Sequence, residues 1–214
     1  MEIIRKQIAY NRTNRNATIK YIVIHDTGNK SKGADAMAHF NYFNGGDRQS
    51  SADFFVDDKS VVQINDYTKY YTWHCGDGKG KYGITNPNSI GIEICVNSDG
   101  NYNNAFLKAV ELTKFLMKEL NIPIERVVRH YDASRKKCPA SMSHNDWSYW
   151  QDFKNRLSDE VIRELVTPND IVWELGHRGI VTDTKGMLDE INKNPNGRLY
   201  WLARKMLHYI RSKE

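Results

Sequence analysis

Cysteine is scarce in this chain. Its 214 residues include only three, and these are Cys75, Cys95 and Cys138. An odd number of thiols does not fit a disulfide framework, which argues against a small secreted domain held together by disulfide bonds. We interpret Cys75 and Cys95 as buried free thiols, while a bond between these two stays open.

Long apolar runs are also missing. No stretch reaches the roughly 18 consecutive apolar residues of a membrane-spanning helix, and residues 1–6 contain no apolar segment of the signal-peptide type. We therefore expect no membrane span and no signal peptide, and we expect synthesis in the cytoplasm. Blocks of five or more like charges are absent as well, which argues against a nucleic-acid-binding arm.

The charge that is present is basic and uneven. The chain has 31 Lys and Arg against 26 Asp and Glu, for a net charge of +5. Residues 1–158 hold 22 basic and 17 acidic side chains, whereas residues 159–214 hold nine of each. A basic first part favours an anionic partner, such as a bacterial wall polymer, a nucleic acid or an acidic lipid.

The most informative stretch runs from Val127 to Pro139. A short apolar strand delivers His130, and a loop with three consecutive cations at 135–137 leads to Cys138. Eight residues separate the histidine from the cysteine, which is too far for one helical face. The spacing therefore predicts a loop that folds back on itself and brings imidazole and thiol together.

A third polar side chain ends another strand. Residues 20–26 have the β-branched content of a central strand, and His25 lies near its C-terminal end. The set His25, His130 and Cys138 has the composition of a catalytic zinc site, with three protein ligands and a fourth position left for water. The alternative is a pair of strand-end histidines and a buried free cysteine.

Hydrophobic periodicity predicts the remaining elements of residues 1–157. The expected strands are 20–26, 52–56, 60–64, 90–96 and 127–130, and the expected helices are 34–43, 104–120 and 146–157. Residues 1–19 are predicted as a loose segment, and the glycine-rich residues 75–88 as a mobile rim. Strands interleaved with helices predict an α/β domain with a mixed, partly parallel central sheet flanked by helices.

The last quarter of the chain has a different pattern. Helical patterns cover 159–166, 168–177, 186–191 and 198–211. We therefore divide the chain into a domain at 1–157 and a small helical module at 159–214, which is near the size limit for independent folding. The module is either a binding unit or a helical extension docked on the first domain.

Five segments, taken in order, resemble one known family. They are residues 22–27 with His25, 55–58, 73–78 with His74, 90–95 with Glu93, and 129–139 with His130 and Cys138. They are similar to the zinc-dependent N-acetylmuramoyl-L-alanine amidases of the type 2 amidase family. That family includes phage endolysins, bacterial autolysins and peptidoglycan recognition proteins, and the match covers residues 1 to about 157.

The resemblance implies a zinc hydrolase of bacterial peptidoglycan. The cleft on one side of the sheet would hold Zn²⁺ through the His/His/Cys set, and the bond cleaved would join N-acetylmuramic acid to L-alanine. The resemblance also implies an endolysin or autolysin that acts in cell lysis, with holin-type release from the host cytoplasm. For residues 159–214 it implies binding to the cell wall.

The resemblance assigns roles to three further residues. Glu93, an acid in an apolar strand, would act as general base and acid, because burial raises the pKa of a carboxyl group. Its alternative is a solvent-facing strand residue, since alternation places it opposite Ile92 and Ile94. Lys136 would stabilise the oxyanion, with its neighbours as surface cations, and His74 would contact substrate or serve the structure.

One position departs from part of the family. Many members carry a catalytic tyrosine on the strand before residues 55–58, and by register that position is Ala52 here. The neighbouring Asp53 would have to turn to the same face to replace it, so the glutamate mechanism is preferred. His39 lacks a companion ligand motif, and we assign it a structural or surface role.

Two alternative functions stay open. A non-catalytic peptidoglycan-binding module of the same fold is one, but the retained Cys138 favours catalysis because such modules typically lose the cysteine ligand. A zinc endopeptidase of the stem peptide is the other, and it would use the same metal chemistry. The sequence does not indicate an oligomeric state.

Overall fold

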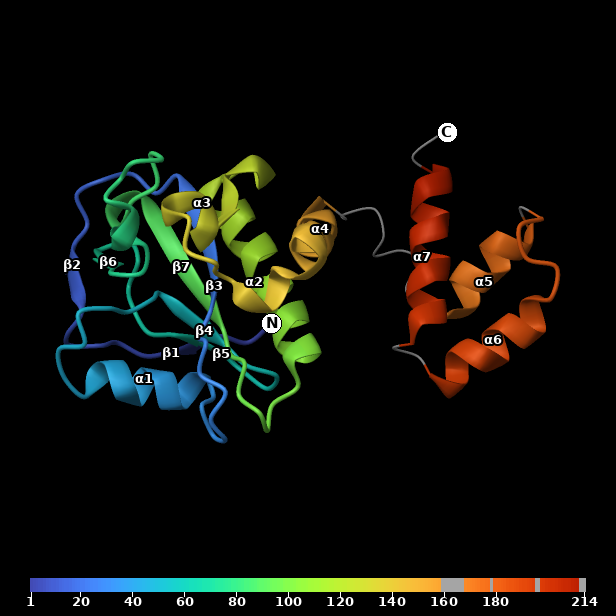
Figure 1. Cartoon of the computed structure of the whole chain (residues 1–214), viewed down its shortest axis with the longest axis horizontal. Helices are drawn as coiled ribbons and strands as arrows, with labels where there is room; N and C mark the ends of the chain where they lie inside the picture. The colour runs from blue at the N-terminus through green and yellow to red at the C-terminus, as the bar shows by residue number, and fades with distance from the viewer. Residues whose placement is uncertain (159–167, 178, 195–196, 212–214) are drawn as a thin grey trace. The chain divides into compact units, whose positions relative to one another are not determined.

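The computed structural model describes residues 1–158, 168–177, 179–194 and 197–211 (Figure 1). The chain divides into two compact units, Met1–Ser158 and Asp159–Glu214. Among the described residues, no helix combines the length and the apolar character that crossing a bilayer requires.

The first unit is built on a six-stranded sheet. In spatial order its strands are β1 (Ile4–Arg5), β5 (Val61–Gln63), β4 (Phe54–Val56), β7 (Ser89–Ile94), β3 (Tyr21–Asp26) and β8 (Val127–Arg129). The four strands β4, β7, β3 and β8 are parallel, while β4 and β5 form an antiparallel hairpin. The predicted mixed, partly parallel sheet is therefore confirmed.

The N-terminal segment is more ordered than predicted. Besides β1, a short strand β2 (Arg12–Asn14) pairs antiparallel with β6 (Tyr70–Thr72). The prediction of a loose segment over 1–19 is wrong at these positions. Strands of two or three residues are too short to show an alternating pattern, and partners far away in the sequence stabilise them.

Helices cover both faces of the sheet. On one face α2 (Tyr102–Leu120) and α4 (His144–Ser158) pack on the largest apolar core, and on the other face α1 (Ala36–Asn44) packs on Phe55 and Val62. The strand residues in the larger core are Ile22, Ile24, Phe54, Val56, Val61, Ile90, Ile92, Ile94 and Val127. Figure 1 shows α1 on one side of the strands and α2 with α4 on another.

Capping residues explain where these helices begin and end. The Asp35 side chain accepts the backbone N–H of Ala38 at the start of α1, and Asn101 accepts that of Asn104 at the start of α2. Helix α2 ends where Asn121 adopts a left-handed conformation with φ of 51°. The predicted helices thus exist, and α2 starts two residues earlier than the sequence suggested.

Several short elements were not predicted. Helix α3 (His130–Ser134) replaces part of the expected loop after β8, and 3₁₀ turns lie at η1 (Gly76–Gly78), η2 (Asn86–Asn88), η3 (Ile124–Arg126) and η4 (Ala140–Met142). Asp132 accepts the backbone N–H of Arg129 at the start of α3. A helix of five residues is shorter than two turns, so helical periodicity cannot indicate it.

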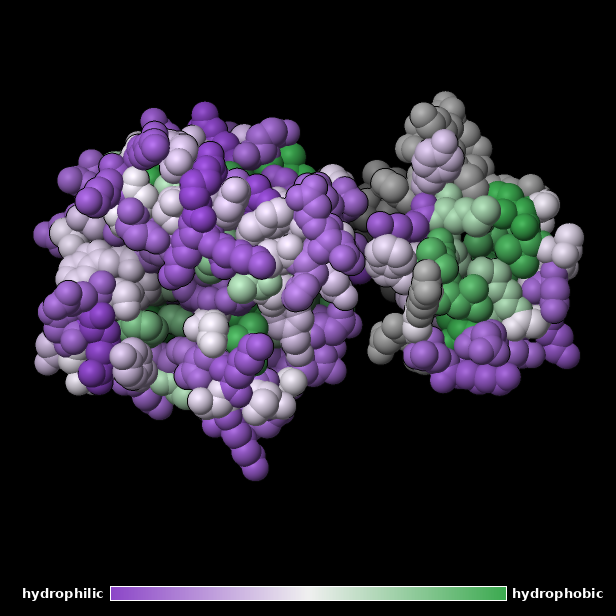
Figure 2. Space-filling model, viewed as in Figure 1, coloured by the Kyte–Doolittle hydropathy of each residue, from purple (hydrophilic) through white to green (hydrophobic). Residues whose placement is uncertain are grey.

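The C-terminal unit contains α5 (Pro168–His177), α6 (Thr184–Lys193) and α7 (Arg198–Arg211). Its core includes Ile171, Leu175 and Ala203. The predicted helix at 186–191 is longer than expected, since Asp183 caps α6 by accepting the N–H of Gly186. The helix expected at 159–166 lies outside the described residues. Hydrophobic side chains are visible on this unit in Figure 2.

Candidate metal centre

The parallel strands bring two of the predicted site residues side by side. In the pairing of β3 with β7, His25 lies opposite Glu93. Both side chains point away from the core under α2, because their neighbours Ile24 and Ile92 point into it. His130 follows directly after β8, which pairs with β3 on its other edge. The carboxyl ends of three adjacent strands therefore meet at one edge of the sheet.

Cys138 reaches this edge because the chain turns back after α3. The backbone N–H of Tyr131 donates to the carbonyl of Cys138 at 3.0 Å, which ties the two ends of the loop together. One ligand atom from each of His25, His130 and Cys138 then lies within 4.8 Å of the others, and all three residues are buried. The structure thus contains the folded-back loop that the spacing predicted.

The free atoms of this cluster fit a metal ion. His130 donates through Nε2–H to the carboxylate oxygen Asp77 Oδ1 at 2.7 Å, whereas its buried Nδ1 has no hydrogen-bond partner among the residues that the structure describes. His25 uses Nε2 with His74 Nδ1 at 3.1 Å, and its Nδ1 lies 3.8 Å from Cys138 Sγ. The Nδ1 atoms of His25 and His130 and the thiol of Cys138 therefore lie together, a donor set suited to zinc or a similar ion.

Electrostatics favours neutral imidazoles in this cluster. Burial lowers the pKa of His25 well below its ordinary value, and the nearby His130 and His74 add to the effect. Burial likewise lowers the pKa of His130, although its hydrogen bond to Asp77 opposes the shift. A neutral imidazole keeps a lone pair, so both rings are in the form that binds a metal.

The Cys138 thiol, in contrast to the imidazoles, is not in the form that binds a metal, which is the thiolate. Burial raises the pKa of Cys138 to about 12, and the carboxylate of Glu93 adds to this. The protein alone therefore disfavours the thiolate, and a cation at the cluster is what would stabilise it.

Glu93 lies between the cluster and an open cavity. Its Oε1 is 3.8 Å from His25 Nδ1, and its buried Oε2 has no hydrogen-bond partner within the described part of the chain. Burial, and next the charge of Asp26, raise the pKa of Glu93 well above its ordinary value. The carboxyl group also lines a cavity of about 540 Å³. The other lining residues are Thr27, Asn29, Ala34, Ala38, His39, Tyr42, Phe43 and Phe55.

Two of the three consecutive cations, Arg135 and Lys136, have different surroundings. The guanidinium of Arg135 lies 4.0 Å from the centre of the Tyr82 ring and donates to the carbonyl of Tyr131. Lys136 is exposed, and its positive charge partly offsets the burial that raises the pKa of both Glu93 and Cys138. The charge of Lys136 therefore acts on the cluster, whereas Arg135 is held against an aromatic ring.

His74 lies behind the cluster instead of in the cavity. It is 9% exposed, and its ring is hydrogen-bonded on both nitrogens, to His25 and to Ser89 Oγ. The sequence left His74 either a contact with substrate or a structural role, and the contact with substrate stays a prediction. Its neighbour in the same motif, Asp77, is a site residue that the sequence analysis missed, since nothing local indicates that it reaches His130.

Three further residues that the sequence analysis discussed, His39, Ala52 and Asp53, are all placed by the structure. His39 stacks on Phe55 with ring centres 5.0 Å apart, and it lines the cavity beside Glu93. Ala52 is fully buried, and the buried carboxylate of Asp53 accepts hydrogen bonds from the backbone N–H of Gly91 and other donors. These other donors are Asn65 Nδ2 and Thr72 Oγ1. The position of the family's tyrosine therefore offers no hydroxyl here.

Comparison with known proteins agrees with this geometry. The family model described as N-acetylmuramoyl-L-alanine amidase matches residues 15–141. The N-acetylmuramoyl-L-alanine amidase CwlH of Bacillus subtilis is 41% identical over 138 residues, which are 64% of this chain and 52% of CwlH. The amidase XlyA of the same species is 40% identical over 149 residues, 68% of this chain and 46% of XlyA.

A solved structure extends the likeness to three dimensions. The catalytic domain of XlyA is 39% identical and has a TM-score of 0.66, and the alignment covers 73% of this chain and 99% of that domain. The chain spans about half the length of CwlH and XlyA themselves. The matched residues include the His/His/Cys cluster and the parallel strands that hold it, and the chain therefore belongs to the N-acetylmuramoyl-L-alanine amidase family.

Proposed function

We propose that this chain hydrolyses the amide bond between N-acetylmuramic acid and L-alanine in bacterial peptidoglycan. The observation that carries the proposal is the buried cluster of His25, His130 and Cys138 with Glu93 beside it at the mouth of a cavity. Membership of the amidase family supports the same reaction, and so does the excess of positive charge in residues 1–158, because wall polymers are anionic.

We propose Zn²⁺ as the ion. His25 and His130 would hold it through Nδ1 and Cys138 through Sγ, which are the atoms that face one another in the cluster. When bound, the ion supplies Lewis acidity that polarises the amide carbonyl and makes a nearby water more acidic. Asp77 would orient the His130 ring through its 2.7 Å hydrogen bond.

Glu93 would move the protons of the reaction. Its raised pKa and its unpartnered Oε2 suit a carboxylate that takes a proton from the attacking water and passes it to the leaving amine nitrogen. Lys136 would stabilise the negative charge that develops on the carbonyl oxygen, because its charge already acts on Glu93 and Cys138. Water exclusion by the buried cluster strengthens both effects.

The test uses purified bacterial cell walls with the zinc-loaded protein and with a chelator-treated control. Mass spectrometry of the released fragments, combined with labelling of new amino termini, identifies the cleaved bond. We expect free L-alanine amino termini that disappear on chelation. New termini within the stem peptide would instead assign a zinc endopeptidase, and binding without release would assign a recognition module.

We further propose that the protein acts in cell lysis as an endolysin or autolysin. The relatives CwlH and XlyA are named as amidases, and one structural neighbour is described as a mutant endolysin from Bacillus subtilis. A phage origin and holin-type release from the cytoplasm stay predictions. Induced expression in a Bacillus host, with and without a co-expressed holin, would test them by the time of lysis.

The C-terminal unit is proposed to bind the cell wall. Its three described helices form a separate core around Leu175, and α7 exposes Leu202 and Met206. Deleting residues 159–214 should weaken sedimentation with purified walls while leaving hydrolysis of soluble wall fragments intact. A truncated chain that fails to fold would instead show that the helices serve as a structural extension.

A further inference from the structure

We propose that His74 and Ser89 are positioning residues that hold the His25 imidazole in the tautomer whose Nδ1 is free to bind the metal. This inference rests on the proposed metal centre and adds a hydrogen-bonded relay behind it. The relay runs from His25 through His74 and Ser89 to the backbone carbonyl of Thr85.

The direction of each hydrogen bond in the relay follows from the group at its end, the carbonyl of Thr85. Ser89 Oγ lies 2.6 Å from the carbonyl oxygen of Thr85, and a carbonyl can only accept, so the single hydroxyl hydrogen points there. Ser89 Oγ also lies 3.1 Å from His74 Nε2, and this bond then needs a hydrogen on Nε2. In a neutral ring with Nε2–H, Nδ1 carries no hydrogen and accepts.

The same reasoning fixes the tautomer of His25, the proposed metal ligand. His74 Nδ1 lies 3.1 Å from His25 Nε2, so His25 must donate through Nε2–H. The Nδ1 atom of His25 is then left with a lone pair, and this is the atom 3.8 Å from Cys138 Sγ. A proton on His25 Nδ1 would block coordination, so the relay selects the ligand form.

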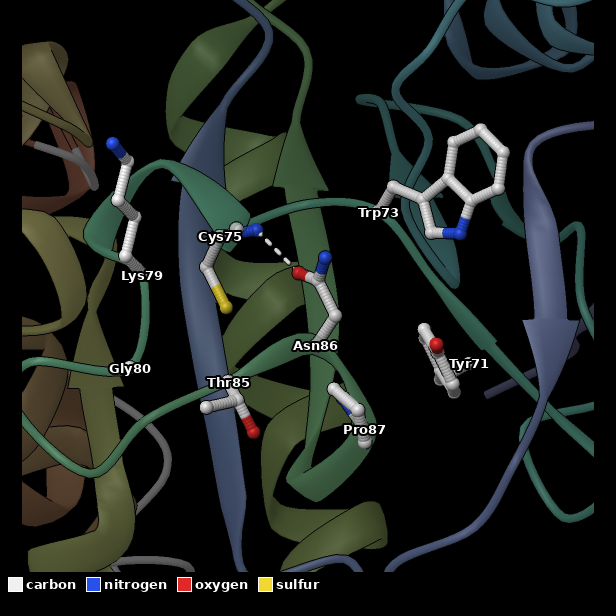
Figure 3. Close-up of a pocket in the computed structure, with 9 residues that line it drawn as sticks. Tyr71, Trp73, Cys75, Lys79, Gly80, Thr85, Asn86 and Pro87 are labelled. Atoms are coloured by element: carbon white, nitrogen blue, oxygen red, sulfur yellow. Dashed lines mark hydrogen bonds between the residues drawn. The ribbon is translucent and has the colours of Figure 1, made fainter.

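The surrounding fold is shaped to hold His74 in this position. A Cβ atom on Gly91 would lie 2.7 Å from His74 Cγ, so only glycine leaves room for the ring against β7. The side-chain oxygen of Asn86 accepts the backbone N–H groups of both His74 and Cys75. Figure 3 shows Asn86 bonded to Cys75, with Thr85 next to it on the same loop. The glycine-rich loop thus supplies both the anchor and the end of the relay.

The relay makes a specific prediction about Ser89→Ala. Without the Ser89 hydroxyl oxygen, His74 Nε2–H loses its hydrogen-bond acceptor, so the ring can carry its hydrogen on Nδ1 instead. It would then donate to His25 Nε2 and leave the His25 hydrogen on Nδ1. We expect the zinc affinity to fall by about 10- to 100-fold, the range typical of residues that orient a metal ligand.

Cys75→Ala is the matched control. Cys75 Sγ is buried and lies 3.7 Å from Ser89 Oγ, so this variant disturbs the same packing without removing the relay oxygen. His74→Asn is the second relay variant, because its side-chain oxygen can accept from His25 at the place of Nδ1, whereas His74→Leu cannot. We expect zinc affinity close to wild type for Cys75→Ala, an intermediate value for His74→Asn and a large loss for His74→Leu.

Two measurements on the full chain test the inference. Zinc affinity is measured by competition with a chromophoric chelator, and histidine ¹⁵N–¹H correlation spectra of the metal-free protein report which ring nitrogen carries hydrogen. We expect Nε2–H for His25 and His74 in the wild type and Nδ1–H for His25 in Ser89→Ala. Nδ1–H for His25 in the wild type, or equal zinc affinities for Ser89→Ala and Cys75→Ala, would overturn the relay.

Failure of the relay is distinguishable from failure of the proposed function. If the wild-type chain binds no zinc, the proposed metal centre is refuted. If the wild type binds zinc tightly and Ser89→Ala binds it equally well, only the relay is refuted. If Ser89→Ala does not fold, the His74→Asn and His74→Leu pair and the wild-type spectra still decide the question.

Discussion

Ile24 and His25 are neighbours in β3, yet they belong to opposite faces of the same sheet. One face carries Ile24 and Ile92, which belong to the apolar core under α2. The other face has His25 and Glu93 one residue further along each strand, and it carries the His/His/Cys cluster and the cavity. The two faces share a backbone, so the difference between core and site is a single step along the strand.

This comparison shows how the site is kept rigid. The buried polar groups of His25 and Glu93 do not stabilise the fold by burial of apolar area, and their desolvation is unfavourable. The isoleucines behind them supply that stabilisation and fix the strand register that puts His25 opposite Glu93. Substitutions on the two faces should therefore affect different quantities: zinc content and activity on the face with His25, and the free energy of unfolding on the face with Ile24.

The largest effect is expected for His25→Ala. It removes one of the three proposed zinc ligands, so zinc content and wall hydrolysis should both fall to background. Metal analysis of the purified protein and a wall-turbidity assay measure the two quantities. His144→Ala, an exposed histidine at the start of α4, is the control and should keep both. Activity retained by His25→Ala would contradict the proposed site.

Glu93→Gln should separate chemistry from metal binding. Glutamine keeps the size of the side chain but cannot take a proton, so turnover should fall by about 10²- to 10⁴-fold while zinc content stays that of the wild type. Single-turnover cleavage of a soluble muramyl peptide measures the loss. Near-normal turnover would show that Glu93 is not the base.

Asp77→Ala should have a smaller effect that extra metal reverses. The carboxylate accepts a hydrogen bond from His130 and is about half exposed, so its removal creates no cavity. We expect zinc affinity to fall by about 10- to 100-fold and activity to recover when zinc is added. If activity stays low at saturating zinc, Asp77 does more than orient the ligand.

Ile92→Ala tests the apolar face and should leave the chemistry nearly unchanged. The side chain is fully buried, and its truncation should lower the free energy of unfolding by about 2–5 kcal/mol. Urea denaturation gives this value, and kcat of the folded fraction should stay near that of the wild type. Leu107→Ala, which removes a 42% exposed side chain in α2, should change stability by less than about 0.5 kcal/mol.

Much of the site could be predicted from local sequence, because its residue types are distinctive. Three local signals indicate site residues without any knowledge of their contacts in space. They are a histidine at a strand end, an acid in an apolar strand and a Cys-Pro after a basic loop. His74 and Asp77 could not be placed in this way. Their partners, His25 and His130, lie 49 and 53 residues away in the sequence. A hydrogen bond over that distance leaves no periodic signal.

By itself, the sequence determined the longer helices and most of the strands of residues 20–157, the three metal-ligand candidates and the family. Alternation and helical spacing are local properties of the chain, so they survive without a structure. Only the tertiary structure decided that His25 lies opposite Glu93, that His74 supports His25 from behind, and that short strands complete the sheet. These are contacts between distant segments, and packing and strand register decide them.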